Sequence, residues 1–567
     1  MAQLVLPVVL VLSFPVCSCS RRTARPRPDA RSTIPREAGI GAHARLSRAA
    51  AMEDVRQLAA ILESSHPDPY LGGGGRIAFH RRVHRALDGI PAGGLTVQQL
   101  LRRLRPLVAS VHDGHTQLRG VRSGSSRRMW VELDAVEERI HVAGVYREQD
   151  RPAVGQRVAA FNGVAWDELV ARSWAFRGAD NAYDNLRHLM QAMREPDLLE
   201  DLLGGVRLGD TIDLELESPG GARSHVTLPM APLSGEPLRP PSRLSLPAPN
   251  AADLAWGFLA ADRSAAILRV DSMMRYREAF EYWRSTGFVA NLGEHLSDVV
   301  RRATGREAPR SVDARVELVP SATRMFQELF AAMREARTSA LVVDLRRNGG
   351  GNSAMTMILG HFLYSPDELA ATDDGYQIPR FSRLYFENNR AMSLEKLQSR
   401  WSLLQPGDLD FSEEQAWRTR PTPLSPDAAV VVEQQLARDA GMMPTFAVVR
   451  RESSAGPRWT GKVVVLTSAS TYSAGFDLAG MLVKHGAVVV GVPSGQAGNC
   501  YIDGLAFRLT HSGLEGSVSY KRSLMFPDDS ARGEMLRPQV ELTYARLVAM
   551  QFDPDAPVRL ALETLGR

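Results

Sequence analysis

The chain has 567 residues, too many for a single hydrophobic core, and it predicts several domains. Hydrophobic residues make up 44% and charged residues 23%, as in an ordinary globular protein. The net charge of +4 is too small for a chain of this length to indicate nucleic-acid binding. Much of the basic excess lies in residues 21–48, which carry eight arginines and predict a disordered Arg- and Pro-rich linker.

Residues 1–20 predict a signal peptide. Their apolar run, Leu4–Val16, is too short to span a bilayer and is followed by small and polar residues. Cys19 is a candidate for bacterial lipid attachment, so a lipoprotein signal also fits. We therefore expect an exported protein that is periplasmic, anchored to the outer membrane or extracellular. Beyond this segment only Cys500 remains, which excludes a disulfide framework, and no Cys/His spacing indicates a metal site.

Residues 49–122 predict a small helical domain. Val55, Leu58 and Leu62 recur at helical spacing, and a second apolar stripe runs from Val97 to Leu104. The domain ends in the sequence His-Asp-Gly-His-Thr at residues 112–116. Two histidines in a glycine-containing loop have either a structural or a catalytic role.

Residues 123–235 carry signals of short strands instead. Turn sequences such as Asn162-Gly163 separate them, and residues 211–216 alternate as a half-buried strand does. The order of strands, turns and one helix resembles a PDZ-like module. Residues 237–250 are Pro-rich and predict a linker.

Residues 250–567 predict an α/β domain. Apolar runs at 340–345, 463–467 and 487–491 are typical of strands buried on both faces of a sheet. A helical stretch between the last two makes a β-α-β unit with parallel strands. The polar stretch at about residues 367–456 predicts an irregular insertion.

Two motifs follow these predicted strands. Residues 344–352, Asp-Leu-Arg-Arg-Asn-Gly-Gly-Gly-Asn, predict either a nest of backbone N–H groups that binds an anion or a tight turn. Ser473 lies between a strand and a helix, where the helix dipole and free N–H groups favour developing negative charge. An isolated serine in that position is more often a helix cap.

Taken together, these segments resemble the C-terminal processing (tail-specific) and tricorn core peptidases, and within them the tricorn-like branch that uses histidine. The resemblance is carried by the Asp-x-Arg-x-Asn-x-Gly-Gly pattern, the nucleophile turn, a Gly-rich segment, the histidine motif and an N-terminal motif, at residues 344–351, 470–475, 491–496, 113–116 and 65–70. It implies a serine-type endopeptidase with a crotonase/ClpP-like catalytic domain, peptide or protein substrates and no cofactor.

The resemblance also implies roles for single residues. Ser473 is the nucleophile, and the N–H groups of Ala474 and of Gly350 or Gly351 form the oxyanion hole. Many of these peptidases pair the serine with a downstream lysine. Here Gln496 occupies the matching position, and none of the lysines of this chain matches it.

His115, in the matching motif, is then the predicted general base, since the intrinsic pKa of an imidazole suits that task near neutral pH. His112 is its nearest competitor. Glu534 is the candidate that orients the imidazole, with Asp528 or Asp529 as alternatives. Two other functions stay open: a non-proteolytic ligand-binding protein and an esterase, both on the same fold.

Overall fold

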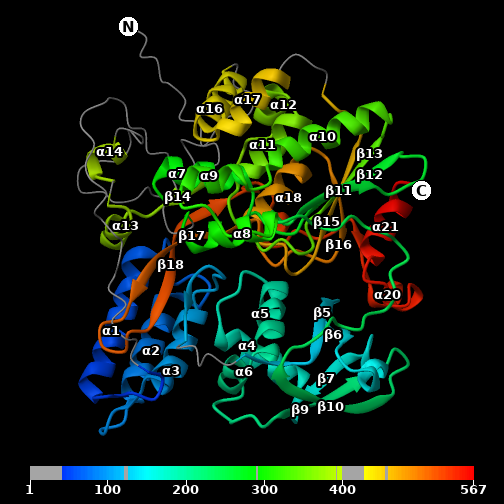
Figure 1. Cartoon of the computed structure of the whole chain (residues 1–567). Coiled ribbons are helices and arrows are strands. Elements are labelled where there is room, and N and C mark those ends of the chain that lie inside the picture. Colours follow the sequence, from blue (N-terminus) through cyan, green and yellow to red (C-terminus); the bar gives the residue numbers. More distant parts are fainter. Residues whose placement is uncertain are drawn as a thin grey trace.

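The computed structural model describes residues 41–120, 126–288, 292–390, 392–398, 427–453 and 458–566 (Figure 1). The predicted signal peptide, Cys19 and most of the predicted linker lie outside the described residues. The end of that linker is folded, because β1 (Arg45–Leu46) pairs with β2 (Leu95–Thr96).

The N-terminal helical unit consists of α1 (Arg48–Ser65), α2 (Gly75–Asp88) and α3 (Val97–Ala109). Ser47 caps α1, and Thr96 forms a capping box with Gln99 at the start of α3. The apolar stripes of α1 and α3 are buried in one core that also contains residues of α2. After α3 the chain turns through His115 into β3 (Gln117–Leu118).

The next unit is a seven-stranded sheet within the described residues, ordered β4-β10-β9-β7-β6-β5 with β8 beside β7. Its strands are β4 (Arg127–Met129), β5 (Val131–Val136), β6 (Arg139–Val145), β7 (Arg157–Phe161), β8 (Val164–Ala165), β9 (Thr211–Glu217) and β10 (Arg223–Pro232). The helices α4 (Trp166–Phe176), α5 (Ala182–Arg194) and α6 (Pro196–Leu202) pack with it in one hydrophobic core.

A second sheet contains the strands that precede the glycine-rich motif and Ser473. In the described residues its order is β11-β12-β13-β15-β16-β19, with β11 antiparallel and the rest parallel. These strands are β11 (Leu254–Phe258), β12 (Ala265–Val270), β13 (Ala340–Asp344), β15 (Lys462–Thr467), β16 (Val488–Gly491) and β19 (Val540–Glu541). The predicted β-α-β unit is confirmed: α18 (Ala474–Lys484) connects the parallel strands β15 and β16.

Both faces of this sheet are covered, which explains its continuous apolar runs. Leu341 and Val343 of β13 face a core with the helices α7 (Arg277–Thr286), α8 (Glu294–Thr304), α10 (Ala322–Glu335), α11 (Ala354–Leu363) and α18. Val342 faces the opposite core, which contains α20 (Tyr544–Ala549), α21 (Ala556–Thr564) and the seven-stranded unit. The alternation follows the two-residue period of a strand.

The described part of the predicted insertion is mostly helical rather than irregular. It contains α12 (Pro366–Ala371), β14 (Tyr376–Pro379), α13 (Arg383–Asn388), α14 (Leu394–Gln398), α16 (Ala428–Met442) and α17 (Pro444–Ser453). These helices have a weak sequence signal because each buries few residues; α16 buries only Val432, Leu436, Asp439 and Ala440.

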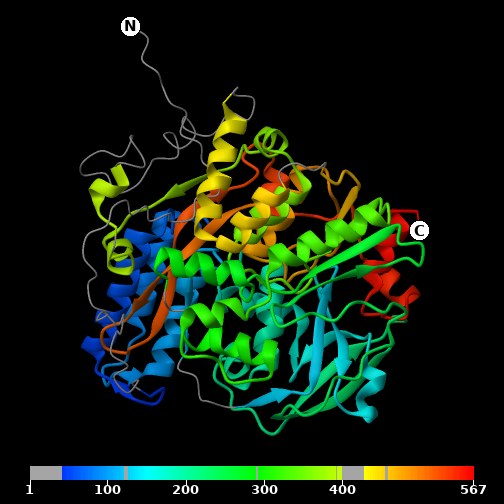
Figure 2. The same cartoon turned by 45° about the horizontal axis from the view of Figure 1, so that its top comes forward.

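A long hairpin connects the catalytic sheet region to the helical unit. It consists of β17 (Asn499–Arg508) and β18 (Glu515–Leu524), and Figures 1 and 2 show it reaching down between the N-terminal helices. Phe507 and Val518 are buried among α1–α3, and β18 pairs with both β14 and β3. The hairpin therefore fixes the segment that carries His115.

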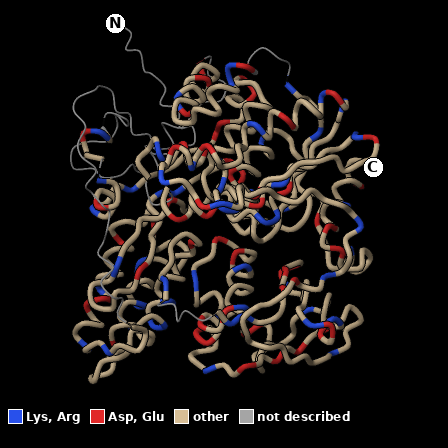
Figure 3. The backbone as a smooth tube through the Cα atoms, viewed as in Figure 1, with Lys and Arg blue, Asp and Glu red and all other residues tan. Residues whose placement is uncertain are grey.

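Charges are spread over the whole molecule. Figure 3 shows acidic and basic residues interspersed along all the described units, in line with the low net charge. Among the helices that the structure describes, none has the length and hydropathy needed to cross a membrane.

Candidate active site

The loops after β13 and β15 meet at one edge of the sheet. The Ser468 hydroxyl donates to the Arg346 carbonyl at 2.6 Å, and the Thr471 hydroxyl donates to the Leu345 carbonyl at 2.9 Å. The Tyr472 N–H donates to the Asn348 carbonyl at 3.0 Å. These bonds tie the glycine-rich motif to the turn that carries Ser473.

Asn348 is fully buried and organises this junction. Its Oδ1 accepts from the Gly350 N–H at 2.9 Å, and its Nδ2 donates to the Val270 carbonyl at 2.9 Å. A Cβ on Gly475 would lie 2.6 Å from Asn348 Oδ1, so the turn requires glycine there. The motif's first residue, Asp344, pairs with Arg346 at 2.8 Å. Burial alone would raise the pKa of Asp344, but the Arg346 guanidinium outweighs it and holds that pKa below its ordinary value.

Ser473 stands in a strained conformation at the start of α18. Its φ of 52° and ψ of −128° are rare for a residue with a side chain. The Ser473 N–H donates to Gln496 Oε1 at 2.6 Å. Gly350 lies directly behind it, since a Cβ on Gly350 would lie 2.5 Å from Ser473 Cβ and 3.1 Å from the Ala474 nitrogen.

The three predicted oxyanion-hole donors differ in their availability. The Gly350 N–H is already donated to Asn348. Within the described residues no acceptor takes the N–H of Ala474 or of Gly351. Of the two glycines left open by the sequence, Gly351 is therefore the one with a donor to offer.

His115 packs against the residue that precedes Ser473. Its Nδ1 lies 3.3 Å from the Tyr472 hydroxyl, and the two ring centroids are 4.9 Å apart. The Tyr472 hydroxyl also donates to Asp180 Oδ2 at 3.2 Å. In the part of the chain that the structure describes, no hydrogen bond joins His115 to Ser473 itself. Tyr472, which directly precedes Ser473 in the chain, is therefore the link between His115 and the Ser473 turn.

The loop of His115 is held from two sides. The Ser517 hydroxyl of the hairpin donates to the His115 carbonyl at 2.9 Å, and the Gly114 N–H donates to Asp180 Oδ1 at 2.8 Å. A Cβ on Gly114 would lie 2.2 Å from the Tyr472 hydroxyl oxygen, so this position also requires glycine. His112 faces elsewhere, against Trp174, with ring centroids 5.7 Å apart.

Three carboxylates surround this corner: Asp113 and Asp184, which are buried, and Asp180, which is half-buried. Asp113 lies between two histidines, 3.3 Å from His66 Nε2 and 4.0 Å from His115 Nδ1. Burial by itself would raise the pKa of Asp113, but the hydrogen bond and charge of His66 lower it below its ordinary value. Burial, together with the two neighbouring carboxylates, raises the pKa of Asp180 well above its ordinary value.

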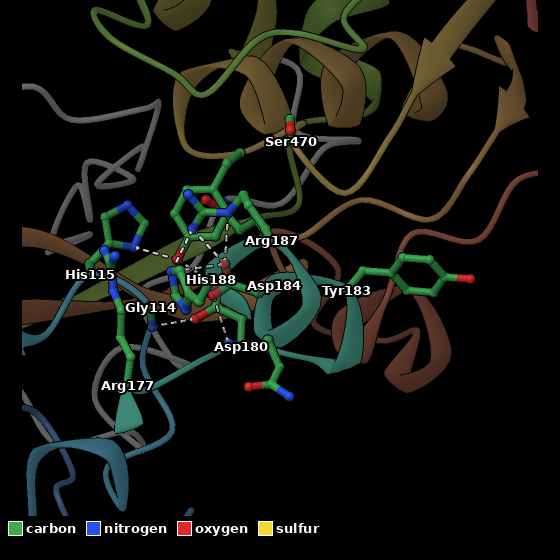
Figure 4. Close-up of polar contacts among 12 residues, drawn as sticks. Gly114, His115, Arg177, Asp180, Tyr183, Asp184, Arg187, His188 and Ser470 are labelled. Carbon is green, nitrogen blue, oxygen red and sulfur yellow. Dashed lines mark hydrogen bonds and ion pairs between the residues drawn. The ribbon is translucent and has the colours of Figure 1, made fainter. Parts of the chain in front are cut away.

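Arg187 supplies the compensating charge. It pairs with Asp184 at 2.5 Å, and its guanidinium lies 4.3 Å above the Tyr472 ring. Figure 4 shows Asp180, Asp184 and Arg187 converging beside His115, while Ser470 lies away from them.

Comparison with known proteins gives this arrangement a context. Residues 314–502 match the model of Peptidase family S41. Over these residues the chain is similar to peptidase family S41. A comparison with curated protein sequences gives no significant match.

Solved structures of CPAF have the same fold as this chain. Mature CPAF complexed with lactacystin aligns with a TM-score of 0.54 at 12% identity, covering 91% of this chain and 98% of that chain. Mature CPAF alone gives 0.53 at 11% identity, covering 90% and 97%. A photosystem II D1 C-terminal processing protease aligns with a TM-score of 0.38 at 12% identity, covering 89% and 98%.

The S41 region contains the strained Ser473 and the glycine motif, but no lysine bonded to the nucleophile among the described residues. Lys484 pairs with Asp374, and Lys521 pairs with Asp503 at 2.6 Å. Lys396 and Lys462 lie on exposed surface. The structure also shows no group of His, Cys, Asp or Glu in its described residues that could hold a metal ion.

The sequence-based assignment of Glu534 does not match this arrangement. Glu534 ends α19 (Ser530–Glu534), is exposed, and makes no hydrogen bond or ion pair with His115 in the described structure. Its alternative Asp529 caps the same helix by accepting from the Arg532 N–H at 3.0 Å. The carboxylate beside His115 is Asp113, which comes from the same loop.

Four residues of this corner had no assigned role from the sequence: His66, Asp113, Asp180 and Tyr472. His66 and Asp113 lie within two of the segments that carry the family resemblance, and this resemblance is the sequence signal that could have indicated a role for them. Asp180 and Tyr472 have no such signal, because their proximity to His115 depends on how α5 and the β15–α18 turn pack.

Proposed function

We propose that this chain is an exported serine endopeptidase that cleaves peptides or protein tails through an acyl-enzyme on Ser473. The observation that carries the proposal is the strained backbone of Ser473, held by Gln496 and backed by Gly350. Strain of this kind persists only where the surrounding structure enforces it, and it is concentrated at functional sites.

In the first step the Ser473 hydroxyl attacks the scissile carbonyl carbon and passes its proton to His115. Such a transfer requires that one ring nitrogen be free of a proton. The Tyr472 hydroxyl has one proton, which it donates to Asp180, so its oxygen accepts from His115 Nδ1–H. That tautomer leaves His115 Nε2 as the base.

The tetrahedral intermediate carries negative charge on the former carbonyl oxygen. The unpaired N–H groups of Ala474 and Gly351 supply donors for it, at the positive end of α18. Collapse of the intermediate breaks the C–N bond as His115 returns its proton to the leaving amine. Water then enters by the same route and releases the acyl group from Ser473.

Further parts of the proposal rest on the sequence. We infer that the six-stranded sheet with α18 is a crotonase/ClpP-like catalytic unit and that residues 123–235 are a PDZ-like module. The boundaries of the helical domain at 49–122 and the catalytic domain at 250–567 are part of the same proposal. Export rests on the apolar run at Leu4–Val16, and membrane attachment would use Cys19.

The test uses a fluorophosphonate probe, which reacts only with an activated serine. We expect labelling of the intact protein, its loss in Ser473→Ala, and its retention in Ser470→Ala, a serine of the same loop that lies away from the His115 cluster. Labelling of the Ser473→Ala protein would refute the proposal.

A second measurement separates the peptidase from its alternatives. Matched peptide and ester substrates with the same acyl group are compared on the wild-type protein. Turnover of the ester alone would indicate an esterase. Absence of both turnover and labelling would favour a ligand-binding protein.

A further inference from the structure

A cavity begins one helical turn from Ser473. It has a volume of about 150 Å³ and lies among α11, α12, α16, α18 and the facing ends of β14 and β18. The Ser353 hydroxyl donates to Asp477 Oδ2 at 2.7 Å at its wall, and the Asp477 N–H donates to the Ser473 carbonyl at 3.0 Å. Ser353 also follows Gly351 closely in the chain, so this wall adjoins the proposed oxyanion hole.

Hydrogen-bond acceptors without partners line this cavity. Asp439 is 2% exposed and Thr356 is 1% exposed, yet Asp439 Oδ1 and Thr356 Oγ1 have no hydrogen-bond partner among the described residues. Gln377 Oε1, on the opposite wall, is also buried without one. Buried polar atoms normally have partners, so an unpaired set at one cavity indicates a missing ligand.

Three carboxylates contribute to the polar part of the wall. Asp373, Asp439 and Asp477 line the cavity, whereas the cation there, Lys484, already pairs with Asp374 outside it. The remaining wall is apolar and includes Met357, Leu436 and Met481. Apolar walls with carboxylate and amide oxygens suit a ligand that has an aliphatic stem and several donors at its tip.

We propose that this cavity is the primary specificity subsite and that it takes the lysine or arginine side chain whose carbonyl Ser473 attacks. A residue held at Ser473 and the oxyanion hole directs its side chain into a neighbouring cavity, and the walls of this one include Asp477, one helical turn after Ser473, and Ser353, which follows Gly351 closely in the chain. The aliphatic stem packs on the methionines and Leu436, and the cationic head reaches Asp439. The inference rests on the proposed peptidase function.

The experiment compares peptides that differ at one side chain: lysine against norleucine, and arginine against citrulline. We expect kcat/KM to be at least about 10-fold higher for each cationic member, since a hydrogen bond to a charged group contributes that much. Asp439→Asn should lower this ratio by about 10-fold. Asp298→Asn, an exposed aspartate of α8, is the matched control and should leave the ratio unchanged. Equal cleavage of both members, or an unchanged ratio in Asp439→Asn, would overturn the proposal.

Two further measurements complete the test of the cavity. If Asp439→Asn fails to fold by circular dichroism, Thr356→Val is used, with a several-fold fall in the ratio expected. Binding of pentylguanidine to the Ser473→Ala protein, measured by calorimetry, tests the cavity without turnover. Binding that Asp439→Asn weakens supports the subsite even if no peptide is cleaved, whereas absence of binding refutes it. Probe labelling of Ser473 without any cationic preference would refute the subsite alone and leave the peptidase function standing.

Discussion

The side chain of Gln496 accepts a hydrogen bond from the backbone N–H of Ser473 at 2.6 Å. Gln496 occupies the position at which the family resemblance predicts a lysine, and it is 2% exposed. It therefore acts on the backbone of the nucleophile and not on its hydroxyl. An amide oxygen can serve this N–H, whereas a lysine ammonium has no acceptor.

Replacing Gln496 by leucine should lower the free energy of unfolding by about 1–3 kcal/mol, because the Ser473 N–H is left buried without a partner. Gln496→Lys should destabilise the protein at least as much and should create no lysine-dependent activity. Urea denaturation and the rate of fluorophosphonate labelling check both variants. Faster labelling of Gln496→Lys would contradict this role.

His115→Ala should lower kcat by about 100-fold to 10,000-fold, the usual contribution of a general base. The matched control is His112→Ala, since His112 lies in the same loop but faces Trp174. Its kcat should stay within about twofold of wild type. Steady-state kinetics on one peptide substrate decides, and equal losses in the two variants would point to a loop effect instead of base catalysis.

Tyr472→Phe should lower kcat by about 10-fold with KM unchanged, because one neutral hydrogen bond that fixes the His115 tautomer is lost. The ring itself, and its packing against Arg187, is retained. A role in packing alone would leave kcat unaltered. The decisive measurement is therefore whether kcat falls while KM stays unchanged.

The variants Asp113→Asn and Glu534→Gln test which of these two carboxylates orients the His115 imidazole. Asp113 is buried, accepts from the backbone N–H of His115 at 2.8 Å, and lies 4.0 Å from His115 Nδ1. Its substitution should lower kcat by about 10-fold to 100-fold, the range for a lost charge-assisted bond. Glu534→Gln should stay within about twofold. A large loss in the Glu534 variant would restore the assignment made from the sequence.

Asp439 gives a prediction about stability and pH. Burial raises its pKa from 3.8 to about 6, against the lowering effect of the Gln435 hydrogen bond and of Arg438. The folded protein therefore binds the proton more tightly than the unfolded chain. Its contribution to stability is fully present below the unfolded pKa and is lost as pH rises through about 6.

Asp439→Asn removes this titration. The variant should match wild type near pH 4 and exceed it above pH 7, by on the order of 3 kcal/mol. Urea denaturation at the two pH values measures the difference. A variant that is less stable than wild type at both pH values would contradict the prediction.

The sequence predicts the catalytic sheet well because its strands are continuous apolar runs. Residues 340–345 and 463–467 give β13 and β15, and the helix between β15 and β16 follows from short-range pattern. The position of Ser473 between a strand and a helix follows from the same local signals, whereas its strained backbone is held by Gln496 and Gly350, which come from other segments.

Contacts between residues that are far apart in the sequence are harder to predict. His115 meets Tyr472 across 357 residues of chain, and Tyr472 and Asp180 carry no motif that indicates this contact. Position along the chain likewise does not show which carboxylate packs beside the imidazole: the sequence favours Glu534, whereas the structure has Asp113 next to His115. Helices of the predicted insertion were missed because α16 presents few buried residues.

The contact between His115 and Tyr472 also has a consequence for biosynthesis. A ribosome that has made the helical unit has produced His115 but not Ser473, because Tyr472 lies 357 residues further along the chain. The hairpin that holds the His115 loop, β17–β18, is made later still. A nascent or truncated chain therefore cannot assemble the pair, and hydrolytic capacity arises only when synthesis is nearly complete.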